Sequence, residues 1–287
     1  MKKGTTFGNA GLYRALIWLL KHTPRKVFYV FEAVFVIPFT LVFSSGARII
    51  YSYFHNIQGW SRWRSIAGTY KNHCIFGQTV IDKFAMYAGD KFRISCHGKE
   101  EYDKHLDQQE SLILLNAHIG CSEILGYSYP SKKPCNVLVY GGEREDLMSY
   151  RKKAFGDRHI KMIPVAAGGS HSEEIIEALN RKEIVSAFAD RFFNDKKSVT
   201  ATLFGREIKL ARGPFSLAVT RGLSVFMTSA MKERDGSYTA FFTPLTYDKT
   251  LSPREQRQQL ADAYCREIER LLKIYPTQWF NFEKVFS

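Results

Sequence analysis

Short apolar runs alternate with helical patterns from residue 111 onward, and this alternation constrains the fold more than any other feature of the chain. A run of about four to eight apolar residues bounded by turn residues is typical of a buried strand. Strands that alternate with helices favour an α/β fold, so we predict a mixed, mostly parallel sheet flanked by helices. The predicted strands are SLILLNA (111–117), CNVLVY (135–140), IKMIPVA (160–166), EIVSAFA (183–189), SVFMTSAM (224–231) and YTAFFTPL (238–245).

Two helix starts carry a recognisable capping signal. Ser170 to Glu173 and Ser252 to Glu255 fit the S-x-x-E capping box, and Pro253 reinforces the second box at the first helical position. After Pro253 the apolar residues recur at spacings of three and four as far as Ile274. The spacing predicts an amphipathic helix over 253–274 that packs one face on the sheet.

Residues 27–43, VFYVFEAVFVIPFTLVF, form an apolar run that only Glu32 and Pro38 interrupt, with basic residues on both sides. A bilayer span needs about 20 apolar residues, so this run is borderline, and a helix embedded in one leaflet with Glu32 turned toward protein fits as well as a full span. An ordinary core helix is the alternative, but the run lacks an amphipathic stripe. We therefore expect residues 1–60 to form a membrane-associating helical segment and residues 61–287 to form a second domain.

The net charge and the cysteines indicate which partners the chain can bind and which kinds of site it lacks. The chain has 41 Lys plus Arg against 28 Asp plus Glu, a net charge of +13, which attracts anionic lipid, an acidic protein or nucleic acid. An aromatic and basic stretch follows the apolar run, as in an interfacial belt, and no nucleic-acid-binding signature accompanies it. The five cysteines form no CxxC pair and no Cys/His group, so neither a zinc site nor a disulfide framework is predicted.

The segment NAHIGCSEI directly follows the predicted strand 111–117 and contains His118 and Glu123. On one regular helix the two side chains would diverge by about 140° and could not meet. If the chain turns at Gly120 into a helix that begins near Cys121 or Ser122, the glutamate on the first turn can reach back to the imidazole. A carboxylate on one ring nitrogen would leave the other as a general base, whereas a solvated loop histidine is the alternative.

Cys121 lies inside the same segment and suggests a second mechanism. In it, Cys121 would act as a covalent nucleophile if the helix start and His118 lowered the pKa of its thiol. The alternative is that Cys121 is packing material, which is the usual role of a buried cysteine.

At these residues the sequence resembles a known family, the bacterial late acyltransferases of lipid A biosynthesis. NAHIGCSEI is similar to the H-x-x-x-x-E form of the H-x-x-x-x-D/E motif of glycerolipid acyltransferases. The segment ADRFFNDKKSVTATLFGREIKLARGPFSLAVTRG (189–222) resembles a further conserved segment, and PTQWFNF (276–282) resembles the family's P-x-Q-W-x-W ending. The resemblance covers nearly the whole chain, including the hydrophobic N-terminal helix.

The resemblance implies an inner-membrane enzyme with its active site at the cytoplasmic face. It would move an acyl chain from an acyl carrier protein or coenzyme A thioester to a hydroxyl or amine of a lipid acceptor such as a lipid A precursor, without metal or organic cofactor. His118 would be the general base and Glu123 its partner, while Asp190, Arg191, Arg212 and Gly213 would bind substrate.

The family's Tyr-Arg-Pro segment after the second strand is replaced by VYGGERED, so Arg144, Arg191 and Arg212 are the candidates to hold the developing oxyanion. Two other functions stay open from the sequence. One is acyl transfer to a lysophospholipid or an acylated amino acid, and the other is a basic membrane or nucleic-acid-binding protein without catalysis.

Overall fold

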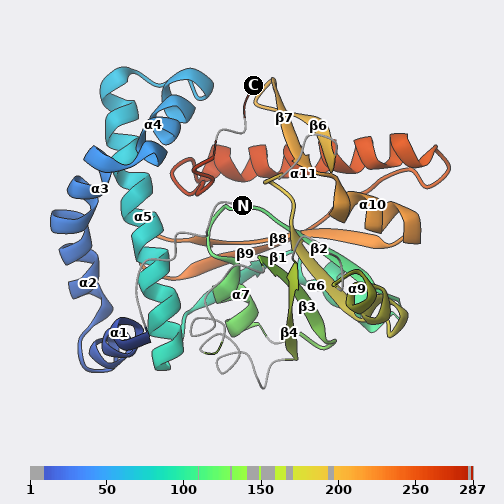
Figure 1. Cartoon of the computed structure of the whole chain (residues 1–287), viewed down its shortest axis with the longest axis horizontal. Helices are drawn as coiled ribbons and strands as arrows, with labels where there is room; N and C mark the ends of the chain where they lie inside the picture. Colours follow the sequence, from blue (N-terminus) through green and yellow to red (C-terminus); the bar gives the residue numbers. More distant parts are fainter. Residues whose placement is uncertain are drawn as a thin grey trace.

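A computed structural model describes residues 10–108, 110–129, 131–140, 149, 159–165, 171–192, 197–283 and 286. Its centre is a seven-stranded sheet in the order β1-β9-β8-β2-β5-β3-β4 (Figure 1). The strands are β1 (Ile94–His97), β2 (Leu112–Asn116), β3 (Cys135–Tyr140), β4 (Ile160–Val165), β5 (Ile184–Phe188), β8 (Ser224–Lys232) and β9 (Tyr238–Pro244).

Neighbouring strands of this sheet are parallel except for the antiparallel pair β8 and β9. The prediction of a mixed, mostly parallel sheet is therefore confirmed, and all six predicted strands are present. The prediction missed β1, which has only four residues, and the separate hairpin β6 (Ser198–Leu203) and β7 (Arg206–Ala211). Phe204 and Gly205 form the hairpin turn, both with positive φ, as a tight two-residue turn requires.

Helices cover both faces of the sheet, because β2 is apolar on both sides. Ile113 and Leu115 belong to a core cluster shared with α9 (His171–Asn180), α10 (Arg212–Arg221) and α11 (Pro253–Ile274). Leu112 and Leu114 belong to a second cluster, on the other face, shared with α1 (Ala10–His22), α5 (Arg62–Ala88), α6 (Lys99–Asp107) and α7 (Ser122–Ser128). A strand buried on both faces is typical of a parallel sheet between helical layers.

The predicted C-terminal helix is confirmed as α11, with the same bounds. Ser252 accepts a hydrogen bond from the backbone of Glu255, and the Glu255 carboxylate accepts one from the backbone of Ser252, so the capping box is complete. Of the other predicted box, Ser170 lies outside the described residues, and α9 begins at His171.

The N-terminal apolar run is helical from Arg25 to Phe43, as α2 (Arg25–Phe31), a π-helical segment η1 (Glu32–Val36) and α3 (Ile37–Phe43). Among the described residues this is one helix long and apolar enough to cross a membrane. Its outer surface exposes large apolar side chains along its whole length: Val27, Val30, Phe31, Val34, Phe35, Val36, Phe39, Val42 and Phe43. We call these nine side chains the apolar strip.

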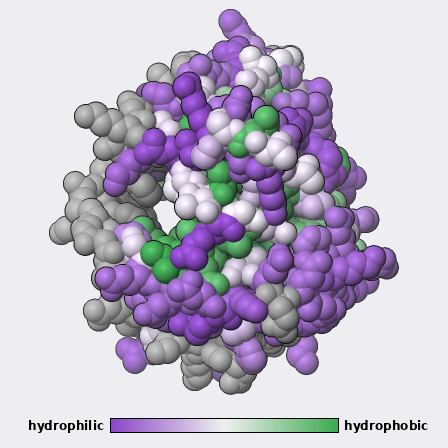
Figure 2. Space-filling model, turned by 90° about the vertical axis from the view of Figure 1, so that its right-hand side faces the viewer, coloured by the Kyte–Doolittle hydropathy of each residue, from purple (hydrophilic) through white to green (hydrophobic). Residues whose placement is uncertain are grey.

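The apolar strip lies on the side of the molecule formed by the N-terminal helices, at the left of Figure 1. The opposite side is mainly hydrophilic and has a hollow with partly hydrophobic walls (Figure 2). Large exposed apolar patches mark sites that bind protein or membrane, so the apolar strip is a candidate for such a site.

Glu32 is buried within this helix and turns toward α5, where Gly77 leaves room for its carboxylate. The π-helical segment runs from Glu32 to Val36, and Pro38 follows in the first turn of α3. Pro38 has no backbone N–H, so it cannot donate the usual helical hydrogen bond to the preceding turn. On the α5 side, the Tyr70 hydroxyl donates to the carbonyl of Ala33 at 2.9 Å.

The following segments, α4 (Ser45–Ser52) and the π-helical η2 (Tyr53–Ile57), join the N-terminal helices to the main core. Ile50, Tyr53 and Phe54 are buried in the same cluster as Trp279 near the C-terminus. These N-terminal helices are therefore packed continuously with the main core.

Candidate active site

His118 and Asp190 meet because two neighbouring parallel strands end at the same level. β2 pairs with β5 in a register that places Asn116 opposite Phe188, and the Ala189 N–H donates to the Asn116 carbonyl. Two residues further along each chain, His118 and Asp190 lie opposite one another. The carboxyl edge of a parallel sheet is where open α/β folds place their sites.

The two side chains form a hydrogen-bonded pair. His118 Nδ1 lies 2.8 Å from Asp190 Oδ1, and the His118 backbone N–H donates to Asp190 Oδ2 at 2.8 Å. The His118 side chain is 28% exposed and that of Asp190 only 6%, so a substrate can reach the imidazole but not the carboxylate. Phe188 packs against the ring, with centroids 4.7 Å apart. Among the described residues only Nδ1 of this ring is hydrogen bonded, so Nε2 is available to accept a proton.

Asp190 is held in its ionised form. Burial by itself raises the pKa of this carboxyl, but the charge and hydrogen bonds of His118 and the charge of Arg191 outweigh it, so the pKa lies below its usual value. An ionised carboxylate on Nδ1 fixes the tautomer of the imidazole and stabilises the imidazolium that forms when Nε2 accepts a proton.

Glu123 lies on the first turn of α7, as predicted, after the chain has turned at Gly120 with φ +58°. Its carboxylate accepts a hydrogen bond from the Tyr87 hydroxyl at 2.8 Å and lies 3.5 Å from Lys83 Nζ. Both partners belong to α5. The position that the sequence suggested for Glu123, on the imidazole, is therefore taken by Asp190, and Glu123 instead ties α7 to α5.

Cys121 is the residue that precedes α7, and its environment disfavours a nucleophilic thiolate. Burial and the negative charge of Glu123 raise the pKa of the thiol to about 12. A reactive cysteine needs the opposite shift.

Of the other predicted site residues, Arg191 is held by hydrogen bonds, whereas Arg212 and Gly213 are exposed. Arg191 Nη2 donates to the Phe280 carbonyl at 3.3 Å, and Arg191 Nε donates to Asn281 Oδ1 at 3.4 Å. Arg212 and Gly213 are exposed at the start of α10. The preceding Ala211 donates its N–H to the Ala189 carbonyl, which holds this helix start beside Asp190. Arg144 lies outside the described residues.

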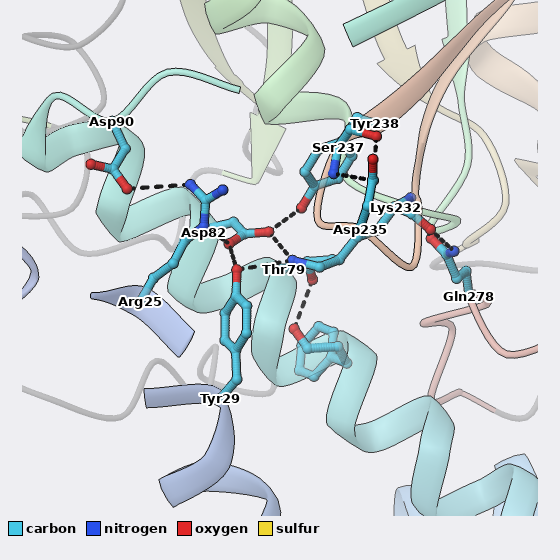
Figure 3. A network of polar contacts seen from close by, with 11 residues as sticks. Arg25, Tyr29, Thr79, Asp82, Asp90, Lys232, Asp235, Ser237, Tyr238 and Gln278 are labelled. Carbon is cyan, nitrogen blue, oxygen red and sulfur yellow. Dashed lines mark hydrogen bonds and ion pairs between the residues drawn. The ribbon is translucent and has the colours of Figure 1, made fainter. Parts of the chain in front are cut away.

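A buried polar network supports the site from the side of the N-terminal helices (Figure 3). Asp82 of α5 accepts hydrogen bonds from the Tyr29 and Tyr238 hydroxyls and pairs with the Lys232 ammonium. The backbone N–H and carbonyl of Lys232 are both bonded to the Gln278 side chain, at 2.8 and 2.7 Å. The network thus joins α2, α5, the end of β8 and the C-terminal segment.

Asp190 was expected among the substrate-binding residues, and sequence reasoning missed its contact with the imidazole. The available signal was its position directly after the apolar strand 183–189, which matches the position of His118 after the strand 111–117. Using it required knowing that these strands are neighbours. No group of three or more His, Cys, Asp or Glu side chains suited to a metal ion occurs within the described part of the chain.

An imidazole supported by a buried carboxylate at the carboxyl edge of a mixed α/β sheet is the arrangement of an enzyme that uses histidine as a base. The model of the family described as bacterial lipid A biosynthesis acyltransferase matches residues 79–287. The chain belongs to this family, which confirms the resemblance seen in its motifs, and it is an acyltransferase that acts on lipids.

Similarity outside the family model is limited. The chain is 15% identical to the 1-acyl-sn-glycerophosphate (LPA) acyltransferase PlsC from Thermotoga maritima, whose crystal structure it matches over 94% of this chain and 99% of that chain. The TM-score of this match is 0.40. No curated protein matches the chain significantly.

Proposed function

We propose that the protein transfers a fatty acyl chain from an acyl carrier protein or coenzyme A thioester to a hydroxyl or amine of a lipid A precursor. The hydrogen bond between His118 Nδ1 and Asp190 Oδ1 is the observation that carries the proposal. Nε2 accepts the proton of the acceptor while its oxygen or nitrogen attacks the thioester carbonyl. The C–S bond then breaks, and the imidazolium returns the proton to the departing thiolate, so the histidine ends neutral.

Glu123 contributes to this site as a positioning residue. Its bonds to Tyr87 and Lys83 hold the start of α7 against α5. Since α7 directly follows the turn at Gly120, this attachment fixes the backbone that carries His118. A partly exposed ion pair of this kind contributes about 0.2 to 1 kcal/mol, so its role is to orient the loop more than to stabilise the fold.

The start of α10 is our candidate for the oxyanion site. The first N–H groups of a helix have no partner within the helix, and they attract negative charge. Arg212 adds a cation at the same place, and removal of one oxyanion donor typically costs about 2.7 to 4 kcal/mol of transition-state stabilisation. The side chain of Arg191 is already bonded to Phe280 and Asn281, so we assign it to the support of Asp190 instead of the substrate.

The apolar strip is our candidate for membrane attachment at the cytoplasmic face of the inner membrane. Helix α5 contacts α2 and α3 and exposes Arg64 and Lys71. A full span would carry α5 into the hydrocarbon, where each charged side chain costs about 2.5 to 3.5 kcal/mol or more. The inward position of Glu32 also favours a helix that lies in one leaflet. Residues 1–60 would form this membrane segment and residues 61–287 the acyltransferase domain.

The test of function is a transfer assay with purified protein in vesicles of anionic lipid. Labelled acyl thioesters of acyl carrier protein and of coenzyme A are offered with a lipid A precursor or, in parallel, with a lysophospholipid. We expect transfer to the lipid A precursor and its loss in His118→Ala. A His118→Ala protein that acylates at the wild-type rate would refute the proposed base, and preference for the lysophospholipid would refute the acceptor.

The membrane arrangement has a separate test. Lys21→Cys and Arg48→Cys, each in a cysteine-free background, place a thiol beyond either end of the apolar strip. A helix in one leaflet makes both thiols accessible to a membrane-impermeant reagent from the same side. Labelling from opposite sides would show a span instead.

A further inference from the structure

The C-terminal segment 276–282 runs alongside the loop that carries His118. Ile119 and Trp279 form an antiparallel bridge. On either side of it, the Phe280 N–H donates to the His118 carbonyl at 2.6 Å and the Gly120 N–H donates to the Gln278 carbonyl at 3.0 Å. The backbone of the catalytic loop is therefore held by a segment that lies far away in the sequence.

Asn281, the next residue of this segment, contacts Asp190 directly. Its side-chain nitrogen donates to the Asp190 carbonyl at 3.0 Å and to Asp190 Oδ2 at 3.4 Å. Its side-chain oxygen accepts from Arg191 Nε at 3.4 Å and from the Glu283 N–H at 3.3 Å. The amide nitrogen thus faces two acceptors and the amide oxygen faces two donors, and this arrangement fixes the orientation of the amide. Asn281 is 1% exposed, so water does not compete for these bonds.

The two oxygens of Asp190 are used differently as a result. Oδ2 receives the His118 backbone N–H and the Asn281 amide, whereas Oδ1 faces the imidazole ring. Two donors on one oxygen prevent rotation of the carboxylate about its axis. Donors to a carboxylate also favour its charged form.

We propose that Asn281 is a positioning residue of the reaction, which sets the plane and the ionised state of Asp190 and through it the basicity of His118. The inference rests on the proposed role of His118 as the general base. Without the amide donor, the anionic His118–Asp190 pair is less stabilised and binds a proton more tightly. The acidic limb of the pH profile then moves to higher pH, and kcat falls while the KM for the acyl donor stays unchanged.

Asn136 provides a matched control. Its side-chain nitrogen also donates to a carboxylate, Glu183 Oε2 at 2.8 Å, and to a backbone carbonyl, that of Ile184 at 3.2 Å. It is equally buried, but it lies near the start of β3, where the parallel strands begin, and the site lies where they end. Asn136→Ala therefore removes the same kind of bonds without touching the His118–Asp190 pair.

The experiment measures kcat, KM and the pH profile of kcat/KM for the full-length protein and for Asn281→Ala, Asn281→Asp and Asn136→Ala, with an acyl thioester and lipid acceptor that the wild type uses. We expect Asn281→Ala to lower kcat about ten- to hundredfold, as for loss of a hydrogen bond to a charged group, and to raise the acidic limb by about one pH unit. In Asn281→Asp the new side chain has the same shape but adds a negative charge beside Asp190, so the acidic limb of its pH profile should lie at a still higher pH. Asn136→Ala should leave the limb in place even where it lowers stability.

The outcomes separate this inference from the proposed function. Suppose that His118→Ala abolishes transfer but the acidic limb of the Asn281→Ala pH profile coincides with that of wild type: the proposed role of Asn281 is then wrong. If Asn281→Ala does not fold, the same comparison is made with Asn281→Asp. The same conclusion follows if Asn136→Ala shifts the limb as far. If His118→Ala remains active, the general base itself is wrong.

Discussion

Replacement of Asp190 by asparagine tests which carboxylate supports the catalytic base. Oδ2 of Asp190 accepts two donors, the His118 N–H and the Asn281 amide, so the asparagine keeps its oxygen there. Its NH2 group then takes the place of Oδ1, 2.8 Å from His118 Nδ1. The ring must present Nδ1 as an acceptor, and the remaining proton moves to Nε2. The base then holds its proton on the nitrogen that should accept one.

The expected loss is large because the wrong tautomer predominates. The same change in serine hydrolase triads lowers kcat about 10⁴-fold, and we expect about 10³- to 10⁴-fold here, equal to about 4 to 5.5 kcal/mol of transition-state stabilisation. Glu123→Gln serves as the comparison. It keeps an acceptor for the Tyr87 hydroxyl and loses an ion pair to Lys83 whose carboxylate is 26% exposed. That ion pair contributes about 0.2 to 1 kcal/mol, so less than about tenfold should be lost.

The assay is transfer of a labelled acyl group under saturating donor, with a thermal melt of each variant to verify folding. The refuting result is a reversed order, in which Glu123→Gln is as slow as Asp190→Asn or slower. Glu123 would then be the partner of His118 during the reaction, and the pair seen with Asp190 would belong to a resting arrangement.

The remaining predictions concern the turn at Gly120, the Cys121 thiol, the buried Lys232–Asp82 ion pair and stability at acidic pH. Gly120→Ala should abolish activity and cost about 2 to 5 kcal/mol of stability, because φ is +58° and a Cβ would collide with the Ala230 carbonyl oxygen. Gly213→Ala is the comparison: a Cβ there meets no atom of the described residues within 4 Å, so this variant should melt within about 2 °C of wild type. Cys121 should resist iodoacetamide in the native protein at pH 8, because its thiol has a pKa of about 12 and stays protonated there. Cys121→Ala should remain active. Rapid alkylation of Cys121 in the native protein would contradict the raised pKa. Lys232→Met should lower the unfolding free energy in denaturant titrations by about 3 to 5 kcal/mol, since it leaves the Asp82 charge buried without its ammonium, and a neutral effect would show that the pair is dispensable. The pKa of the Asp190 carboxyl is lowered in the folded protein, so on acidification the unfolded chain takes up this proton at a higher pH than the folded chain does. The stability that the ionised carboxylate contributes is therefore present above the usual pKa of about 3.9 and is lost as the pH falls through the lower pKa of the folded state. Thermal melts should show that the stability advantage of wild type over Asp190→Asn becomes smaller below about pH 4.

Elements with a local signal were predicted well from the sequence. The strands 111–117 and 224–231 are short, mainly apolar runs, and the helix over 253–274 has its capping box and its three- and four-residue spacing within one stretch of chain. The turn at Gly120 and the helical position of Glu123 were predicted for the same reason. Strand β1 was missed because its alternation of apolar and polar residues, Ile-Ser-Cys-His, extends over only four residues, the shortest stretch in which such a pattern can be recognised.

The membrane segment illustrates an intermediate case. The apolar run 27–43 and the exception at Glu32 are visible in the sequence, and they predict a helix that belongs in or on a bilayer. That Glu32 turns toward Gly77 depends on α5, which begins at Arg62, thirty residues later in the chain. The direction of a side chain on a helix follows from the sequence only when the partner surface is known.

By itself the sequence determined the α/β class, the family and the histidine, since each rests on patterns and motifs that are recognised one short stretch of chain at a time. Only the tertiary structure decided which carboxylate supports that histidine. His118 meets Asp190, 72 positions away, because β2 and β5 are neighbours with Asn116 opposite Phe188, and Asn281 joins them from the C-terminal segment. The order of strands in a sheet is set by packing between distant segments, and a spacing motif within one segment does not contain that information.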